Sequence, residues 1–183
     1  MKILYFDCFS GISGDMTLGA LIDLGLDQSV FLNELNKLNV SGYTLDIKKA
    51  SKNGILGTDV NVILEQNTYD NLHQQQGSEH SHSKDHHANH QHERNLSDIE
   101  KIINMSDLKP RVKDMSIKIF REIAQAEAKV HGRSINEVHF HEVGAIDSIV
   151  DVVGYCICID MLGVEKIFAS ELHDGKGFVQ WGL

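Results

Sequence analysis

Histidine is the residue type whose distribution in this sequence points most directly to chemistry. Seven of the 11 histidines fall in one short tract: His73, His80, His82, His86, His87, His90 and His92. A neutral imidazole offers a lone pair that suits nickel, zinc, copper or cobalt, and a flexible chain can bring several imidazoles to one ion. We predict that the tract captures such a metal. The alternative is a tolerated low-complexity insertion whose metal affinity is incidental.

The residues around these histidines also predict disorder. Between Leu72 and Leu96 the only apolar side chain is that of Ala88. Such a segment buries too little apolar surface to offset the entropy of ordering it. We therefore expect a long disordered insertion over residues 73–95.

A second motif is the sequence DCFSGISGDM, residues 7–16, which lies between a predicted strand and a predicted helix. In one interpretation its glycines let the backbone approach a ligand, and amide groups at the helix start attract a phosphate. The residues that would bind this substrate are Ser10, Gly11, Ser13 and Gly14. In a second interpretation the carboxylates of Asp7 and Asp15 hold a divalent cation. The structural alternative is that Asp15 caps the helix and the glycines only shape the turn.

A third motif is the sequence HFHEVGAIDSIVD, residues 139–151. His139 and His141 share a face if the chain is extended there, because alternate strand side chains point the same way. Asp147 and Asp151 are neighbours on one face of the helix that is expected to follow. Carboxylates on an otherwise apolar helix need a partner, which indicates either a metal or catalytic site, or ion pairs with a lysine or arginine. We interpret Cys156 and Cys158 as buried fillers.

The motifs together define the predicted site. The predicted metal ligands are the seven histidines of the tract with His139, His141 and Asp151. The predicted catalytic carboxylates are Asp7, Asp15, Glu142 and Asp147.

Apolar periodicity places these motifs on an α/β fold, a layered sheet with packed helices. Strands are expected at 2–7, 43–47, 60–64 and 167–172, the first of them buried. Asn53-Gly54 predicts a hairpin between the two central strands, with a second arm that is irregular around Gly57. Helices are expected at 15–25, 29–38, 97–104, 110–130 and 145–162.

Length and composition limit the class of protein. The 183 residues predict one α/β domain, built from residues 1–72 and 96–179, with the insertion 73–95 and an atypical end at 180–183. A net charge of −9 argues against binding to nucleic acid or to an anionic membrane. No apolar run is long enough for a membrane span, and the first residues lack the pattern of a secretory signal, so we expect neither feature. Three cysteines are typical of reduced thiols in the cytoplasm.

The glycine loop, the histidine-rich insertion and the motif at 139–151 resemble, in this order and spacing, the LarC family of pyridinium-3,5-bisthiocarboxylic acid mononucleotide nickel insertion proteins. The resemblance covers residues 1 to about 179. It implies a CTP-dependent insertion of nickel into an organic mononucleotide, with Mg or Mn accompanying the CTP. Nickel–carbon and nickel–sulfur bonds form, which yields the nickel-pincer cofactor of lactate racemase.

The same resemblance implies partners. Family members are a little over twice as long, and their C-terminal half is associated with the nucleotide-dependent chemistry. We therefore expect the mononucleotide substrate, a C-terminal half chain, lactate racemase indirectly, and self-association. Two alternatives stay open: a non-enzymatic nickel chaperone or store, and a metal-dependent phosphohydrolase.

Overall fold

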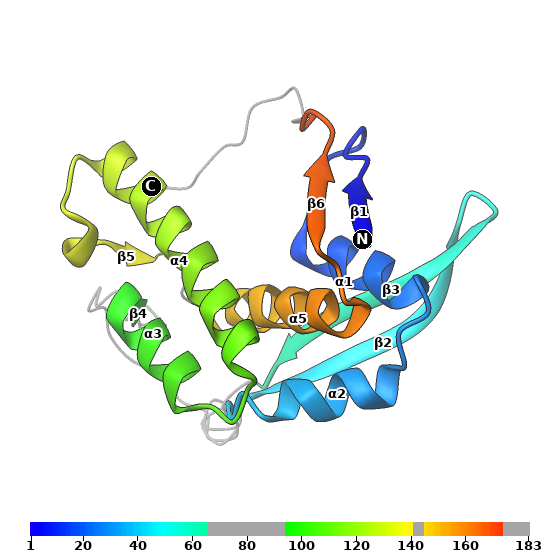
Figure 1. Cartoon of the computed structure of the whole chain (residues 1–183), viewed down its shortest axis with the longest axis horizontal. Helices are drawn as coiled ribbons and strands as arrows, with labels where there is room; N and C mark the ends of the chain where they lie inside the picture. The colour runs from blue at the N-terminus through cyan, green and yellow to red at the C-terminus, as the bar shows by residue number, and fades with distance from the viewer. Residues whose placement is uncertain (66–93, 141–144, 174–183) are drawn as a thin grey trace, which may run out of the picture.

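The computed structural model describes residues 1–65, 94–140 and 145–173, which form a mixed α/β fold (Figure 1). The histidine tract, His141 and Glu142 lie outside the described residues. The predicted α/β class is confirmed, but the strands of the described residues do not form one layered sheet. They form three separate two-stranded sheets, and helices provide most of the buried surface.

Five α-helices lie in the described residues, close to the predicted ranges. They are α1 (Gly14–Asp23), α2 (Gln28–Asn36), α3 (Leu96–Met105), α4 (Pro110–His131) and α5 (Ile146–Leu162). Side-chain caps fix several starts: Asp27 accepts from the amides of Ser29 and Val30, and Asn95 forms a capping box with Asp98. Between α4 and α5 lies a short 3₁₀ turn, η2 (Ile135–Glu137).

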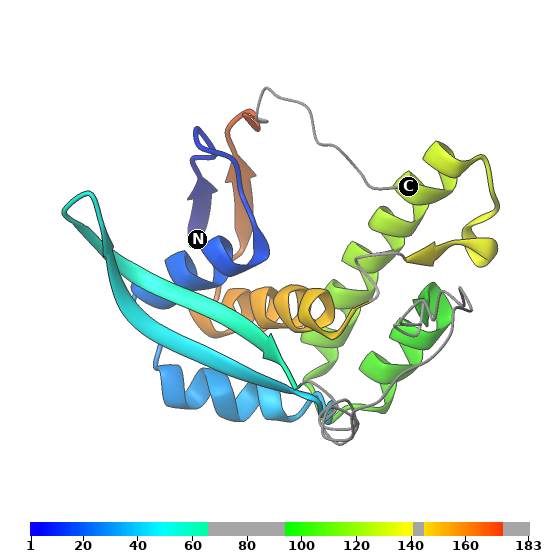
Figure 2. The ribbon, with the colours of Figure 1, turned by 180° about the vertical axis from the view of Figure 1, so that it is seen from behind.

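The longest sheet is the predicted hairpin. Strand β2 (Tyr43–Lys52) pairs antiparallel with β3 (Ile55–Leu64), and both arms are longer than expected. Asn53 and Gly54 have φ angles of 54° and 80°, as a tight hairpin turn requires. The expected irregularity at Gly57 is wrong, because Gly57 pairs in register with Ala50. Figure 2 shows the turn projecting beyond the helices.

The other two sheets are short and join distant parts of the chain. Strand β1 (Ile3–Phe6) runs parallel to β6 (Lys166–Ala169), and β4 (Arg94–Asn95) pairs antiparallel with β5 (His139–Phe140). The prediction of a buried first strand is wrong. Burial alternates along β1, because one face packs on the core and the other is exposed. The pairing of β4 with β5 was not predicted from the sequence.

Helix α5 lies at the centre of the core, in contact with α1, α2, α4 and β3 (Figure 1). Its apolar side chains are covered on nearly every side, and Cys156 and Cys158 are fully buried among them. Burial raises the pKa of the Cys156 thiol to about 11 and that of the Cys158 thiol to about 12. Both cysteines are therefore neutral fillers at physiological pH, as predicted.

Helix α1 lies against β3 at unusually close range. A Cβ atom built on Gly19 would lie 2.3 Å from the carbonyl oxygen of Thr58, so only glycine fits at this point. At the end of the helix the carboxylate of Asp23 accepts hydrogen bonds from the ammonium of Lys49 and from the amide and hydroxyl of Thr58. These bonds lower the pKa of Asp23 to about 2. The two contacts fix α1 on the hairpin.

Among the described helices, none combines the length and the apolar character that crossing a bilayer would require.

We expect Gly19→Ala to destabilise the fold by about 1–3 kcal/mol, because the added methyl group forces α1 away from Thr58. Without this contact the sign would be reversed, since alanine is favoured over glycine inside a helix by about 1 kcal/mol. Denaturant unfolding measures the difference. Ala20→Ser, at an exposed neighbouring position of the same helix, is the control and should change stability little. A stabilised Gly19→Ala protein would contradict the close approach.

Candidate functional site

Asp151 lies on α5, one helical turn after Asp147, and its carboxylate is in close contact with the backbone of the glycine loop at Gly14. A Cβ atom built on Gly14 would lie 2.0 Å from Oδ2 and 2.4 Å from Cγ of Asp151. Any larger residue at position 14 would therefore displace the carboxylate. The loop motif at 7–16 and the motif at 139–151, far apart in the sequence, meet at this contact.

The carboxylate of Asp151 also lines an open cavity of about 600 Å³, here called the Asp151 cavity. This volume lies within the usual range for small-molecule sites. The lining comes from β1, the glycine loop, α1, α4, α5, β6 and the residues after it, and most of it is apolar. The lining residues are Phe6, Cys8, Ile12, Ser13, Gly14, Thr17, Ile119, Ile123, Asp151, Val152, Tyr155, Ile167, Ala169 and Leu172.

Burial and like charges act together on Asp151. Desolvation raises the pKa of this carboxyl to about 7, with further contributions from the negative charges of Asp15 and Asp147. Its Oδ1 atom is buried and has no hydrogen-bond partner within the described residues. The pKa of Asp15 is raised as well, by desolvation and by the charges of Asp147 and Asp59. Asp151 can therefore gain or lose a proton near neutral pH.

This arrangement of acids favours a cationic ligand over an anionic one. The negative charges of Asp15 and Asp147 raise the pKa of Asp151, and the charge of Asp147 also raises that of Asp15. A bound cation would relieve the negative potential that these charges create. The described residues alone contain no group of three or more His, Cys, Asp or Glu side chains placed to hold a metal ion. Any metal bound here would need ligands from other residues or from the substrate itself.

The glycine loop has its own hydrogen bonds. Ser13, and not Asp15, is the N-cap of α1: its hydroxyl accepts from the amide of Met16 at 3.2 Å, because its backbone is extended where the helix begins. The structural alternative that Asp15 caps the helix is therefore wrong. The amide of Gly11 donates to the carbonyl of Cys8 at 3.1 Å, which closes a tight turn. Ser10 lies exposed on this turn.

The β4–β5 pair joins the two histidine-bearing segments of the chain. Asn95 pairs with His139, and Arg94 pairs with Phe140. In the sequence the tract ends at His92, two residues before β4, and His141 follows β5 directly. The strand pair thus brings together the residues that follow the tract in the sequence and the residues that precede His141.

A ring contact anchors this pair of strands. Phe140 is buried, and its ring lies 6.4 Å from that of Phe120 on α4, in an edge-on arrangement. Residues 141–145 then lead from β5 into α5, which carries Asp147 and Asp151. The strand pair therefore links the tract to the helix of the carboxylates.

The structure brings together only part of the predicted site. Ser13, Gly14 and Asp151 line one cavity, and the charges of Asp15 and Asp147 act on Asp151. Asp7 is exposed and is not among the charges that act on Asp151. The carboxylate of Asp147 accepts a hydrogen bond from the backbone amide of Ser148 at 2.8 Å. The tract, His141 and Glu142 lie outside the described residues, and His139 is described only by its backbone in β5.

Sequence reasoning missed Thr17 and Tyr155 of the cavity and the nearby charge of Asp59. Tyr155 follows Asp151 by four residues on α5, and that helical spacing could have indicated it. Asp59 lies on β3, and no local pattern connects it with Asp15.

Comparison with known proteins gives a consistent result. The profile of the nickel insertion protein family matches residues 4–182, slightly beyond the end of the resemblance at about residue 179. Proteins of Acetivibrio thermocellus, Clostridium kluyveri and Clostridium acetobutylicum are 56%, 52% and 51% identical to the chain over 98% of its length. Each is described as a pyridinium-3,5-bisthiocarboxylic acid mononucleotide nickel insertion protein.

These relatives are much longer than the matched region. The chain spans 41%, 43% and 46% of their respective lengths and corresponds to their N-terminal portion. No solved structure matches the chain.

We expect Asp151→Asn to stabilise the protein above neutral pH. With a folded pKa of about 7 and an unfolded value near 3.9, the wild-type carboxyl contributes most stability in its protonated form, below pH about 4. That contribution declines as the pH rises to about 7 and stays constant above it. Asparagine has no such cost, so the difference in unfolding free energy should grow between these pH values. The full pKa difference corresponds to about 4 kcal/mol, and solvent screening of this half-buried group reduces it to about 1–3 kcal/mol.

Denaturant unfolding at pH values from 4 to 8 measures this profile. The control is Asp7→Asn, which removes an exposed carboxylate from the same loop motif and should leave the pH profile parallel to that of the wild type. Parallel profiles for Asp151→Asn as well would contradict the burial of this acid.

Proposed function

This chain belongs to the nickel insertion protein family, and we propose that it gathers nickel and holds the organic substrate during nickel insertion. The substrate class is that named for its relatives, pyridinium-3,5-bisthiocarboxylic acid mononucleotide. The observation that carries the proposal is the meeting of the glycine loop and Asp151 at one cavity. Nickel is the cargo of this reaction.

The first step is nickel capture by the tract His73–His92. Several neutral imidazoles can hold the ion reversibly. The tract precedes β4 in the sequence, and β4 pairs with β5, the strand that carries His139. Glu142, Asp147 and Asp151 follow in the sequence and are proposed to supply oxygen ligands or a negative field.

The Asp151 cavity suits the ring of the proposed substrate. A pyridinium ring is flat and positively charged, so it gains from apolar walls and from a nearby carboxylate. Phe6, Ile119 and Tyr155 provide such walls, and Asp151 provides the counter-charge. The negative potential from Asp15 and Asp147 adds to the attraction for both the ring and the metal.

Asp151 is also suited to accept a proton. Forming a metal–carbon bond at a C–H position, or a metal–sulfur bond at a thioacid, releases a proton. A carboxyl with a pKa of about 7 has the right strength to take it at neutral pH. We assign this role to Asp151 because Oδ1 is buried and has no hydrogen-bond partner among the described residues. Asp7, Asp15, Glu142 and Asp147 then act electrostatically or as ligands.

The phosphate of the mononucleotide is proposed to lie at the loop formed by Ser10, Gly11, Ser13 and Gly14. The nearby acids repel a bare phosphate, so a bridging cation is part of this proposal. CTP with Mg or Mn belongs to the complete reaction. Because the described residues alone offer no set of three metal-holding side chains, we assign the CTP-dependent step to the polypeptide that follows the match in longer relatives.

Removal of residues 73–92 is expected to abolish most nickel binding at neutral pH, as measured by equilibrium dialysis. Imidazoles with a pKa near 6.5 protonate in acid, so the intact chain should release this nickel by pH about 4.5. A matched control changes the seven histidines of the tract to Gln and keeps the length of the chain. A nickel ion that the deleted chain retains, and that the deleted chain with His141→Ala loses, would demonstrate a second nickel site outside the tract.

If all nickel is lost with the tract and His141→Ala has no effect, the chain acts as a nickel chaperone or store, and the second nickel site is refuted. Retention of nickel by the intact chain at pH 4.5 would contradict imidazole ligation.

Gly14→Ala is expected to weaken binding of the mononucleotide about tenfold or more, because the methyl group displaces the carboxylate of Asp151. Nickel uptake by the tract should be unchanged. Titration of the metal-free mononucleotide, followed by calorimetry, measures the first effect, and equilibrium dialysis measures the second. Gly132→Ala is the control: it strains a helix end at φ 61° far along α4 from the cavity, so it tests for a general loss of stability.

The function itself is tested by supplying CTP, nickel and the mononucleotide with and without the C-terminal portion of the Acetivibrio thermocellus relative. We expect nickel insertion only when both portions are present, and a lower rate with Gly14→Ala. Unchanged binding and insertion in Gly14→Ala would refute the role of the cavity. Hydrolysis of CTP by this chain alone with added divalent metal would instead favour a phosphohydrolase.

A further inference from the structure

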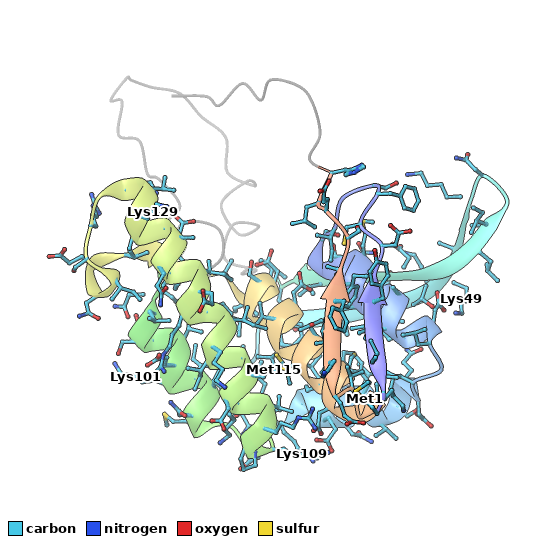
Figure 3. All side chains as sticks on the ribbon, turned by 45° about the horizontal axis from the view of Figure 1, so that its top comes forward. Met1, Lys49, Lys101, Lys109, Met115 and Lys129 are labelled. Atoms are coloured by element: carbon cyan, nitrogen blue, oxygen red, sulfur yellow. The ribbon has the colours of Figure 1, made fainter. Side chains whose placement is uncertain are left out.

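The outer face of the β1–β6 pair is apolar and uncovered among the described residues. In the parallel register Tyr5 lies beside Phe168, and Ile3 lies beside Lys166. These four residues define the outer face. Ile3, Tyr5 and Phe168 are 49%, 60% and 53% exposed. Figure 3 shows the two strands side by side in the foreground of the molecule.

Parallel strands are normally covered on both faces, and a pair of strands is marginally stable by itself. The inner face follows this rule in part, because Leu4 and Phe6 pack against the core. The outer face does not. Each strand also has only one neighbour among the described strands, which leaves a free edge on both sides. Such edges readily accept a further strand. The pair therefore has the features of an incomplete sheet.

The lengths of the relatives identify what completes it. More than half of the Acetivibrio thermocellus relative lies beyond the region that matches this chain. The last described strand is β6, which ends at Ala169, shortly before the family match ends at residue 182. In these relatives the additional polypeptide thus begins a few residues after β6. Its effective concentration at the uncovered pair of strands is therefore high.

The position of the cavity supports the same occupant. Phe6, Ile167 and Ala169 of the two strands line the Asp151 cavity from their inner side, and Leu172, just after β6, is 61% exposed at its edge. A polypeptide that covers the outer face and the edges would therefore border the cavity. Residues from both portions of the protein would then line one site.

We propose that the outer face and free edges of the β1–β6 pair are the docking surface for the polypeptide that follows residue 182 in the longer relatives. That polypeptide adds at least one strand to the pair and covers Ile3, Tyr5 and Phe168 with apolar side chains. The surface serves this intramolecular or half-to-half contact, and a second copy of the chain is not its occupant. The inference concerns assembly and does not depend on the chemistry of nickel insertion.

Hydrogen exchange tests the proposal. The 183-residue chain is compared with the same chain continued by the polypeptide that follows the match in the Acetivibrio thermocellus relative, both at concentrations where they are monomeric. Amides of residues 3–6 and 166–169 should exchange at least tenfold more slowly in the longer protein. Amides of α5 should be protected in both. The intact relative, compared with its own truncation at the end of the match, repeats the measurement in a natural protein.

Tyr5→Asp places a charge on the outer face and tests its role in docking. In the longer protein it should remove most of the additional protection of residues 3–6 and 166–169, while the exchange of α5 in the 183-residue chain should not change. Val130→Asp, at an exposed apolar position near the end of α4, is the matched control and should preserve the protection. Equal exchange at residues 3–6 and 166–169 in short and long proteins, in both the joined chain and the intact relative, would overturn the proposal. Protection that appears in the short chain only as its concentration rises would identify a second copy as the occupant and also overturn it.

Discussion

The burial of α5 is the constraint on which the rest of the structure depends. This helix is apolar on nearly every side, so it is stable only when other elements cover it all round. α1, α2, α4 and β3 provide this cover, and their positions follow from it. One carboxylate, Asp151, lies on the part of α5 that is covered by α1 and the glycine loop. The site therefore results from the packing of the core.

Two close approaches by glycine determine how α1 meets its neighbours. Gly19 lets the helix lie against Thr58 of β3. Gly14, the first residue of the helix, lies against Asp151 of α5. The first contact positions the helix, and the second leaves room for a carboxylate that would otherwise be displaced. Desolvation in this setting favours the protonated acid, and ionised Asp15 and Asp147 favour it further. A cation bound in the cavity would reverse that preference, since it would stabilise the charged carboxylates. On the proposed function, proton release and cation binding would thus be coupled at Asp151.

Local patterns predicted much of the fold because they depend on neighbouring residues. The helical period, the caps and Asn53-Gly54 gave the five helices and the hairpin with errors of a few residues, and the spacing of Asp147 and Asp151 gave their common helix. Pairings between distant segments were harder. The apolar run at 3–6 is equally typical of a buried strand and of one with an open face, so the exposure of Tyr5 required the structure. The cavity required the contact between Gly14 and Asp151, which are far apart in the sequence.

The β4–β5 pair is too short for its few backbone hydrogen bonds to hold it, so side-chain packing must do so. The buried ring of Phe140 against Phe120 provides this packing. Through it the segment that ends the histidine tract is attached to α4, and the segment that begins the second histidine motif is attached to the start of α5. Along the chain, α5 then carries Asp147 and, one turn later, Asp151. On the proposed function, carboxylate oxygens hold nickel less tightly than several imidazoles do, so the ion would pass to the substrate only because the sulfur and carbon donors there bind it more tightly still.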